Sequence, residues 1–313
     1  MTLQVVVGAG PVGTAVARLL VQRGDRVRLI SRRGGAPEGV EGVAADATNG
    51  DELARLAEGA ATIYSCAGPP YPRWATDWPP LGAGLVRAAE LSKAVLVTTG
   101  NLYAYGEVDG PIREDLPLRP NSVKGEVRKQ VWIDALTAHE AGRIRTAEVR
   151  GSDYLGVGAI SPYSVLVLPK ILKNKAASVP ADLDALHSWT YVGDVARTLI
   201  AVAEDETAWG RAWHVPSPEP MSLRALATLT AELAGTAPAR ISTMPEFALR
   251  LAGLVNATAR ASVETQYQWR QPFILDSAAA MVAFGIKPAK IADAVAEMIA
   301  VGSNRSAAPG VRH

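Results

Sequence analysis

The feature that most constrains this chain is a glycine pattern close to its first residues. Residues 8–13 read Gly-Ala-Gly-Pro-Val-Gly, which matches G-x-G-x-x-G. A valine-rich run at residues 3–7, typical of a buried parallel strand, precedes the pattern, and residues 14–22 have helical spacing. The alternative is a simple strand-to-helix turn. In this context, however, the pattern predicts a dinucleotide-binding loop made of Gly8, Gly10, Pro11, Val12 and Gly13.

Strand and helix signals alternate along the first half of the chain. We expect strands at 3–7, 26–30, 42–45, 61–66, 94–98 and 146–149, and helices at 14–22, 51–58, 81–92 and 122–141. This alternation predicts an α/β protein with a Rossmann-type, doubly wound parallel sheet. Helical patterns then recur at 194–203, 223–234, 245–254, 277–284 and 289–300. They predict a smaller, mostly helical C-terminal substrate domain.

The expected domain boundaries follow from the change from strand–helix alternation to mainly helical patterns. We expect the dinucleotide-binding domain to comprise residues 1–153 and about 188–204. The substrate-binding part is expected at about 154–187 and 205–302, where residues up to 187 show little periodicity. Residues 303–313 are mostly polar or small and are predicted to form a frayed tail.

Composition excludes several classes of function. The 313 residues, 48% of them hydrophobic, suffice for a buried core, and a net charge of +1 attracts neither nucleic acid nor an anionic membrane. The single cysteine precludes an internal disulfide and fits a reducing compartment. No signal-peptide pattern or long apolar run is present, and the histidines lack metal-ligand spacing. We therefore expect a cytoplasmic protein with a small-molecule substrate, without a metal, nucleic-acid or membrane partner; a homodimer is compatible with the sequence.

The end of the second expected strand indicates the type of cofactor. An acidic residue there would bind the ribose 2′-hydroxyl of NAD(H). This chain instead has Ser31, Arg32 and Arg33, whose hydroxyl and guanidinium groups suit a 2′-phosphate. The alternative is that the arginines are solvated surface charge. The sequence therefore favours NADP(H) over NAD(H).

Seven further segments follow one another in an order that is itself informative: 46–47, 65–68, 102–106, 114–120, 150–158, 189–196 and 276–288. They resemble the extended short-chain dehydrogenase/reductase superfamily, of the NAD-dependent epimerase/dehydratase type, over nearly the whole chain. The resemblance implies that Asp46 and Ala47 contact the adenine. It also implies that the cofactor site is lined where the fourth and fifth strands end, by Cys66, Ala67, Gly68 and Thr99. Cys66 is expected to serve as a packing residue at the floor of this site.

The catalytic signature of that superfamily is altered in this chain. The superfamily uses Tyr-x-x-x-Lys on the helix after the proline-containing loop, with a Ser or Thr nearby. Aligned through Arg119-Pro120 and Gly125, the tyrosine position holds Lys124, the lysine position holds Arg128, and Asn101 stands at the Ser/Thr position. By this resemblance, Arg128 keeps a cation at the nicotinamide ribose but does not donate a proton. The chain is therefore identified as an atypical member.

Three side chains are candidates for the missing acid chemistry. Tyr103 stands two residues after Asn101 on an extended segment, so both side chains are expected on the same side. Tyr103 is the first candidate for the acid, and the Asn101 amide is suited to hydrogen-bond a carbonyl oxygen. Lys124 is a candidate to polarise that oxygen or to donate a proton. The alternatives are that Tyr103 merely packs against a ligand and that Lys124 lies on the surface.

Aromatic residues are expected to form the substrate wall. Tyr71, Trp74 and Trp78 follow the fourth strand, at the sheet edge where ligands bind. Tyr154 and Trp189 are candidates for the same role. The alternative is a hydrophobic lid or packed loop.

These observations lead to one main functional hypothesis and two alternatives. The main hypothesis is an NADP(H)-dependent reductase or dehydrogenase that acts on the carbonyl, or a conjugated double bond, of a small molecule. The first alternative is a non-redox isomerase, cyclase or lyase on the same cofactor-binding scaffold. The second is a regulatory protein that senses NADP(H) without turnover.

Overall fold

A computed structural model describes residues 1–307 of the chain, with side chains described through residue 302. The described part divides into two compact units. The first unit comprises Met1–Gly151, Gly193–Pro216 and Leu275–Lys287. The second comprises Ser152–Val192 and Ser217–Ile274 together with the residues from Pro288 onward. The two units are described separately below.

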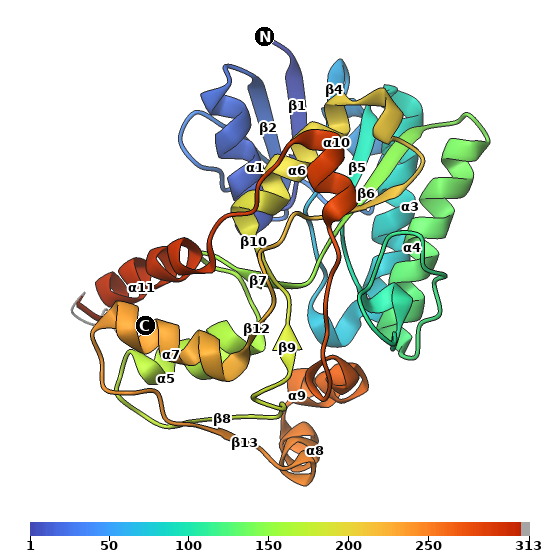
Figure 1. Cartoon of the computed structure of the whole chain (residues 1–313). Coiled ribbons are helices and arrows are strands. Elements are labelled where there is room, and N and C mark those ends of the chain that lie inside the picture. The colour runs from blue at the N-terminus through green and yellow to red at the C-terminus, as the bar shows by residue number, and fades with distance from the viewer. Residues whose placement is uncertain (308–313) are drawn as a thin grey trace. The chain divides into compact units, whose positions relative to one another are not determined.

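A seven-stranded parallel sheet forms the centre of the first unit (Figure 1). Its order is β11-β6-β5-β4-β1-β2-β3. The strands are β1 (Leu3–Val7), β2 (Arg26–Ser31), β3 (Glu41–Ala44), β4 (Ala60–Ser65), β5 (Val95–Asn101), β6 (Arg145–Gly151) and β11 (Ala212–His214). All six strand pairings are parallel, so the carboxyl ends of the strands share one edge. The expected Rossmann-type α/β fold is confirmed.

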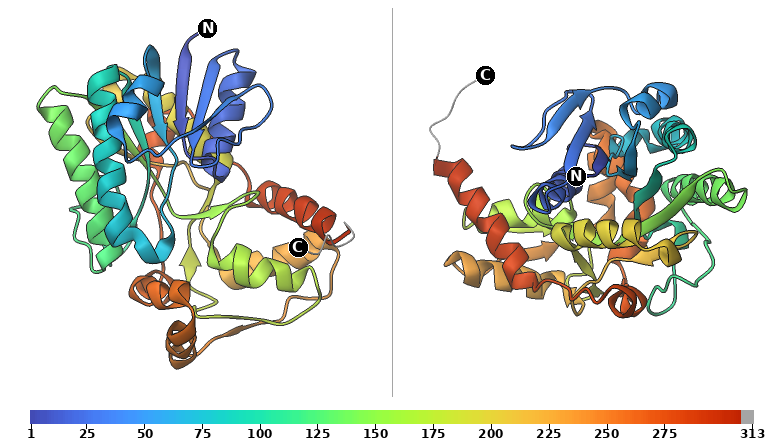
Figure 2. Two further views of the ribbon diagram at one scale, coloured as in Figure 1. Left: turned by 180° about the vertical axis from the view of Figure 1, so that it is seen from behind. Right: turned by 90° about the horizontal axis from the view of Figure 1, so that it is seen from above.

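Helices cover both faces of this sheet. They are α1 (Pro11–Gln22), α2 (Gly50–Leu56), α3 (Trp74–Ser92), α4 (Val123–Glu140), α6 (Val192–Glu204) and α10 (Ala278–Phe284), with short turns η1 (Tyr71–Arg73), η2 (Tyr103–Tyr105) and η4 (Glu206–Ala208). Figure 2 shows α3 and α4 side by side on one face, while α1 and α6 lie on the other. Apolar side chains of α2, α3 and α4 pack on Val5, Val7 and Ile63 of the sheet. This burial is the main stabilising term for the layer that carries the site.

Local signals explain where the functional helices begin. Pro11 starts α1, whose buried Val12, Val16 and Leu20 recur at helical spacing. The Ser122 hydroxyl accepts a hydrogen bond from the Gly125 amide at 3.1 Å and caps α4. Both helices were expected from the sequence, with ends that differ by up to three residues.

Helix α3 begins earlier than expected. The sequence predicted a helix only from residue 81. Pro79 and Pro80 lie just before it, and proline normally interrupts a helix. The structure continues the helix through both prolines from Trp74 onward. Trp74 and Trp78 lie one turn apart with ring centroids 6.0 Å from each other, so aromatic packing supports the turn that the prolines weaken.

The second unit combines short strand pairs with helices. The strands are β7 (Asp153–Leu155), β8 (Ala177–Val179), β9 (Leu186–His187), β10 (Trp189–Tyr191), β12 (Met221–Ser222) and β13 (Ile241–Thr243), paired as β10-β7, β12-β9 and β13-β8. The helices are η3 (Tyr163–Val167), α5 (Leu168–Ile171), α7 (Leu223–Ala234), α8 (Glu246–Val255), α9 (Ala257–Ser262), η5 (Val263–Trp269) and α11 (Ile291–Ala307). A core of its own surrounds Tyr163 and Trp189. Residues 151–187 therefore hold more regular structure than their weak periodicity indicated.

The division of the chain differs from the expected one in four segments. Residues 152–153 and 188–192 belong to the second unit, whereas the sequence assigned them to the dinucleotide-binding domain. Residues 205–216 and 275–287 belong to the first unit, whereas the sequence assigned them to the substrate part. Residues 205–216 join the first unit because β11 pairs with β6 at the edge of the sheet. Residues 275–287 join it because the Asp276 carbonyl oxygen accepts a hydrogen bond from His214 Nδ1 of β11. Residues 303–307 continue α11, contrary to the expected frayed tail, and 308–313 lie outside the described residues.

No helix in the described part of the chain is both long enough and apolar enough to cross a membrane.

Candidate cofactor pocket and acid site

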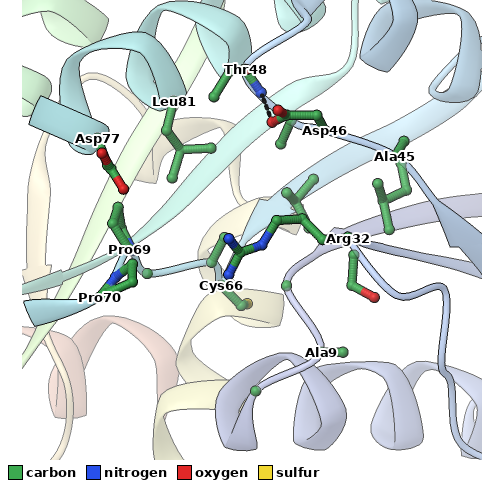
Figure 3. Close-up of a pocket in the computed structure, with 18 of the residues that line it drawn as sticks. Ala9, Arg32, Ala45, Asp46, Thr48, Cys66, Pro69, Pro70, Asp77 and Leu81 are labelled. Carbon is green, nitrogen blue, oxygen red and sulfur yellow. Dashed lines mark hydrogen bonds between the residues drawn. The ribbon is translucent and has the colours of Figure 1, made fainter. Parts of the chain in front are cut away.

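A pocket of about 550 Å³ lies at the carboxyl edge of the sheet in the first unit (Figure 3). The ends of β1, β2 and β4 supply its floor, where the chain leaves β1 to enter α1. This is the point at which strand order reverses, the usual place for a ligand in a doubly wound sheet. Its volume lies within the range of small-molecule and cofactor sites.

The three glycines of the loop have different surroundings. A methyl group on Gly13 would lie 1.9 Å from the Gly8 carbonyl oxygen, and one on Gly8 would lie 2.6 Å from the Ala67 nitrogen. Gly8 also has φ +109°, which side-chain-bearing residues rarely adopt. A methyl group on Gly10 would meet nothing within 4 Å, and Gly10 lines the pocket. Two glycines therefore serve close packing, while the third keeps backbone accessible to a ligand.

Most of the predicted cofactor residues line this pocket together: Gly8, Gly10, Ser31, Arg32, Arg33, Asp46, Ala47, Cys66, Ala67 and Gly68. In Figure 3 the Arg32 side chain projects into the pocket. The Ser31 hydroxyl accepts a hydrogen bond from the Gly34 amide, which leaves its own proton available as a donor. The Asp46 carboxylate accepts one from the Thr48 amide at 3.0 Å. Pro11, Val12 and Gly13 form the first turn of α1 directly after the lining glycines.

The floor of the pocket is chemically quiet. The Thr99 hydroxyl lies 3.8 Å from the Cys66 sulfur, as a weak hydrogen-bond donor to it. Burial raises the pKa of the Cys66 thiol to about 12. The thiol is therefore protonated near neutral pH, which agrees with a packing role.

The segment after β4, expected at the sheet edge where ligands bind, forms one wall of the pocket, and only the contribution of Asp77, Pro80 and Leu81 was not expected. Pro69, Pro70, Arg73, Asp77, Pro80 and Leu81 also line it. Arg73 and Asp77 form an ion pair at 3.0 Å, one turn apart on α3 and η1. Their position depends on α3 starting at Trp74, which the two prolines obscured.

The predicted acid-site residues lie together beside this wall. The Tyr71 and Tyr103 phenol oxygens are 3.4 Å apart, and the Lys124 Nζ lies 4.5 Å from the centroid of the Tyr71 ring. Trp74 contacts both tyrosine rings, at centroid distances of 5.1 Å and 5.8 Å. Lys124 is only 5% exposed, so it is not the surface lysine that the sequence left open. We call Tyr71, Trp74, Tyr103 and Lys124 the phenol cluster.

Asn101 supports the cluster through the backbone. Its side-chain oxygen accepts a hydrogen bond from the Tyr103 amide at 3.2 Å, at the end of β5. The amide NH₂ remains a donor of the kind that a carbonyl oxygen requires. Gly125 allows α4 to approach, because a methyl group there would lie 2.5 Å from the Tyr103 carbonyl oxygen.

Arg128 is directed into the protein. Its Nη2 donates to the Thr99 carbonyl oxygen at 2.8 Å and to Glu148 at 2.9 Å, and the guanidinium stacks 4.2 Å from the Trp78 ring. Arg128 is 3% exposed and does not line the pocket. This geometry gives no support to the expected contact between Arg128 and the nicotinamide ribose. The Glu148 carboxylate already neutralises the guanidinium charge.

Glu148 begins a buried polar chain that the sequence analysis did not identify. Arg150 donates to Glu148 at 2.8 Å and to the Tyr105 hydroxyl at 2.7 Å. The Tyr105 hydroxyl lies 2.9 Å from His214 Nε2, and His214 Nδ1 lies 2.7 Å from the Asp276 carbonyl oxygen. A carbonyl oxygen only accepts, so His214 carries its proton on Nδ1 and accepts from Tyr105. The sequence signal for this chain was the pair of charged residues Glu148 and Arg150 within β6, an interior strand of the sheet.

This chain of hydrogen bonds includes Tyr105 of η2 but not Tyr103, so the two tyrosines have different environments. Burial raises the pKa of Tyr105 and lowers that of His214, so both stay neutral near pH 7. The chain ends at a backbone carbonyl, and the Tyr105 hydroxyl is held between Arg150 and His214. Tyr105 is therefore engaged in hydrogen bonds within the protein, whereas Tyr103 belongs to the phenol cluster.

The expected substrate residues have different environments. Tyr71 and Trp74 belong to the phenol cluster and are half-buried. Trp78 is 5% exposed and packs in the sheet core, and Trp189 is fully buried in the second unit, where its indole donates to the Met221 carbonyl oxygen. This burial corrects the expectation for Trp78 and Trp189, because neither presents surface to a substrate. Tyr154 is half-buried on β7.

The family model for the NAD-dependent epimerase/dehydratase family matches residues 4–215. The chain therefore belongs to this family, and the resemblance seen in the sequence is confirmed. No curated protein matches the sequence.

Solved structures of UDP-sugar enzymes share the fold. UDP-glucuronic acid 4-epimerase from Bacillus cereus, in complex with NAD, has a TM-score of 0.77 at 15% identity, covering 97% of this chain and 99% of that chain. UDP-glucose 4-epimerase from Thermotoga maritima, with UDP-glucose, has a TM-score of 0.79 at 15% identity over 98% and 100%. MoeE5, in complex with UDP-glucose and NAD, has a TM-score of 0.78 at 20% identity over 98% and 100%. At these identities the similarity establishes the fold alone.

Proposed function

We propose that this chain is an NADP(H)-dependent oxidoreductase that acts on the carbonyl, or a conjugated double bond, of a small molecule. The observation that carries the proposal is the phenol cluster beside a glycine-lined dinucleotide pocket. Tyr71 and Trp74 alternate with the pocket-lining Pro70 and Arg73 along the chain, which makes the two sites continuous. The candidate proton donor and the candidate cofactor pocket thus belong to adjoining segments of one unit, which supports the proposal.

The pocket residues fit a dinucleotide with a 2′-phosphate. Gly10 leaves backbone accessible at the start of α1, where no side chain caps the helix and the helix dipole favours a phosphate. Arg32 and Arg33 line the pocket where β2 ends and are exposed. Guanidinium groups bind phosphate in paired hydrogen bonds, and no acid stands at the position that would favour a free 2′-hydroxyl. We therefore favour NADP(H), whereas two of the similar structures named above, UDP-glucuronic acid 4-epimerase from Bacillus cereus and MoeE5, hold NAD.

The test of cofactor choice is a binding titration with NADP⁺ and NAD⁺. Replacing Arg32 and Arg33 together by Ser should weaken NADP⁺ binding at least about tenfold and leave NAD⁺ binding unchanged. Arg26→Ser is the matched control, because Arg26 is an exposed arginine at the opposite end of β2. Equal affinity for both dinucleotides in the unmodified protein would refute the NADP(H) preference.

When bound, the nicotinamide would supply a hydride to the substrate or take one from it. Tyr103 is the residue that we assign to donate the proton to the substrate oxygen. The Asn101 amide would hold that oxygen, and Lys124 would stabilise the negative charge left on the phenol pair. Arg128 has no direct role in this scheme, because its guanidinium bonds Glu148 and the Thr99 carbonyl.

The reaction is tested by NADPH consumption against a panel of small carbonyl compounds. Removing a general acid typically costs 10²–10⁴-fold in rate. We expect a loss of about 100-fold or more in Tyr103→Phe, with cofactor affinity unchanged. Full activity in a variant that combines Tyr103→Phe with Lys124→Ala would refute the assignment of the acid site.

A redox-neutral isomerisation or epimerisation is the second candidate. Membership of the NAD-dependent epimerase/dehydratase family favours it. Turnover without net change in NADPH absorbance would support this candidate, and stoichiometric NADP⁺ formation would exclude it. Tight cofactor binding without turnover of any tested substrate would instead support the regulatory alternative.

A further inference from the structure

The orientation of the two phenols gives them different roles. The Tyr71 hydroxyl is placed as the donor to the Tyr103 oxygen, at 3.4 Å, the long end of a hydrogen bond. A phenol has one proton to donate and lone pairs with which to accept. If Tyr71 donates to Tyr103, the Tyr103 proton remains for a different acceptor. Tyr71 is therefore positioned to donate its proton to Tyr103, and Tyr103 to donate its own proton to another acceptor.

Lys124 brings a cation close to the ring of Tyr71. Lys124 Nζ lies 4.5 Å from the centroid of the Tyr71 ring. An ammonium over an aromatic face is attracted to the ring and stabilises negative charge that develops on it. Lys124 is 5% exposed, so water and salt screen this interaction less than they would on the surface.

The packing of the cluster keeps this arrangement in place. Trp74 touches both tyrosine rings, and its indole N–H donates to the Pro69 carbonyl oxygen at 3.1 Å. Tyr71, Tyr103 and Lys124 come from η1, η2 and the first turn of α4. Three elements of the same unit therefore fix the two hydroxyls and the ammonium relative to one another.

We infer that Tyr71 is a second proton-transferring residue, which passes its proton to Tyr103 while Lys124 stabilises the resulting charge on Tyr71. The inference rests on the proposed function. The substrate carbon would receive a hydride from the reduced nicotinamide, and the substrate oxygen would take the Tyr103 proton as the carbonyl π bond breaks. Tyr103 would then take the Tyr71 proton, and the Tyr71 phenolate would recover a proton from water after the product leaves. Lys124 thus contributes through its contact with the Tyr71 ring.

The kinetic test is Tyr71→Phe, which keeps the ring, its contact with Trp74 and its contact with Lys124. We expect kcat to fall about tenfold, KM and NADP⁺ affinity to stay unchanged, and the solvent deuterium isotope effect on kcat to increase. Tyr191→Phe is the matched control, because it removes a phenol hydroxyl bonded to Glu297 in the second unit. Unchanged kcat and isotope effect in Tyr71→Phe would overturn the inference.

A second test needs neither cofactor nor substrate. Phenolate formation is followed by near-ultraviolet absorbance during a pH titration of the unmodified protein, Tyr71→Phe, Tyr103→Phe and Lys124→Met. We expect one phenolate to form at lower pH than the other tyrosines, to be lost in Tyr71→Phe, to remain in Tyr103→Phe, where Lys124 still lies over Tyr71, and to shift upward by about one pH unit in Lys124→Met. Superimposable early titrations in the unmodified protein and Lys124→Met would overturn the inference.

The two tests separate the inference from the proposed function. Absence of NADPH consumption with every carbonyl compound, together with the expected phenolate titration, would refute the reductase proposal but retain the coupled phenols. NADPH consumption with an unaltered titration in Lys124→Met would retain the reductase and refute the relay.

Discussion

Arg128 and Glu148 form an ion pair at 2.9 Å in which both side chains are only 3% exposed. Arg150 binds the other oxygen of the same carboxylate at 2.8 Å. One carboxylate therefore lies between two buried guanidinium groups. Such an arrangement stabilises the fold only as long as each charge keeps its partner.

The first prediction is that Glu148→Gln strongly destabilises the first unit. The change leaves two buried cations without a carboxylate, and breaking a buried pair typically costs about 3–5 kcal/mol. Denaturant unfolding followed by circular dichroism should show this as a lower free energy of unfolding. Arg87→Lys is the control, because Arg87 forms an exposed pair with Asp51 and should change stability by less than about 1 kcal/mol. Equal stability of Glu148→Gln and Arg87→Lys would contradict the prediction.

The second prediction separates binding from packing within the glycine loop. Gly10→Ala should leave the melting temperature unchanged and weaken dinucleotide binding about tenfold or more, because the added methyl group enters the open pocket. Gly13→Ala should destabilise the fold by about 1–3 kcal/mol, because its methyl group would overlap the Gly8 carbonyl oxygen.

The measurements are thermal unfolding and a binding titration with NADP⁺. Gly35→Ala is the control: a methyl group there meets nothing within 4 Å, and Gly35 does not line the pocket. A lower melting temperature in Gly10→Ala with unchanged binding would reverse the roles that the structure gives to Gly10 and Gly13.

The features that the sequence predicted are those encoded locally. The glycine pattern is contained in six consecutive residues, and the strand–helix alternation depends on short periodic patterns. The positions of Ser31 to Arg33 and of Asn101, Tyr103 and Lys124 follow from strand ends and helix starts. Parallel strands bring such ends to one edge, so their proximity could be anticipated.

The features that the sequence did not predict depend on contacts between distant residues. The chain from Glu148 through Arg150 and Tyr105 to His214 joins β6, η2 and β11, which meet only after the sheet has formed. The start of α3 at Trp74 depends on packing that overrides two prolines. The inward direction of Arg128 depends on a carboxylate twenty residues away, which no local pattern reveals.

The third prediction concerns stability at low pH. Burial lowers the pKa of His214 below its unfolded value of about 6.5, so the unfolded chain binds the proton more readily than the folded one. The contribution of neutral His214 to the free energy of unfolding is therefore fully present above about pH 6.5. It is lost as the pH falls from there toward the lower folded-state pKa.

The test compares the pH dependence of the unfolding free energy in His214→Gln and in the unmodified protein. Glutamine does not titrate, so the slope below about pH 6.5 should decrease in the variant. Identical slopes in His214→Gln and the unmodified protein would contradict the assignment of acid sensitivity to His214.

The last prediction uses Cys66 as a probe of the pocket floor. With a pKa raised to about 12, roughly one Cys66 in 10,000 is a thiolate at pH 8, compared with about a quarter of ordinary thiols. Thiol reagents attack the thiolate, so the folded protein should react on the order of a thousandfold more slowly at pH 8 than the protein in denaturant. Because Cys66 is the chain's one cysteine, mass spectrometry after timed exposure to iodoacetamide measures it directly. Rapid modification of the folded protein would show that the pocket floor stabilises a thiolate, and the inert packing role of Cys66 would then be wrong.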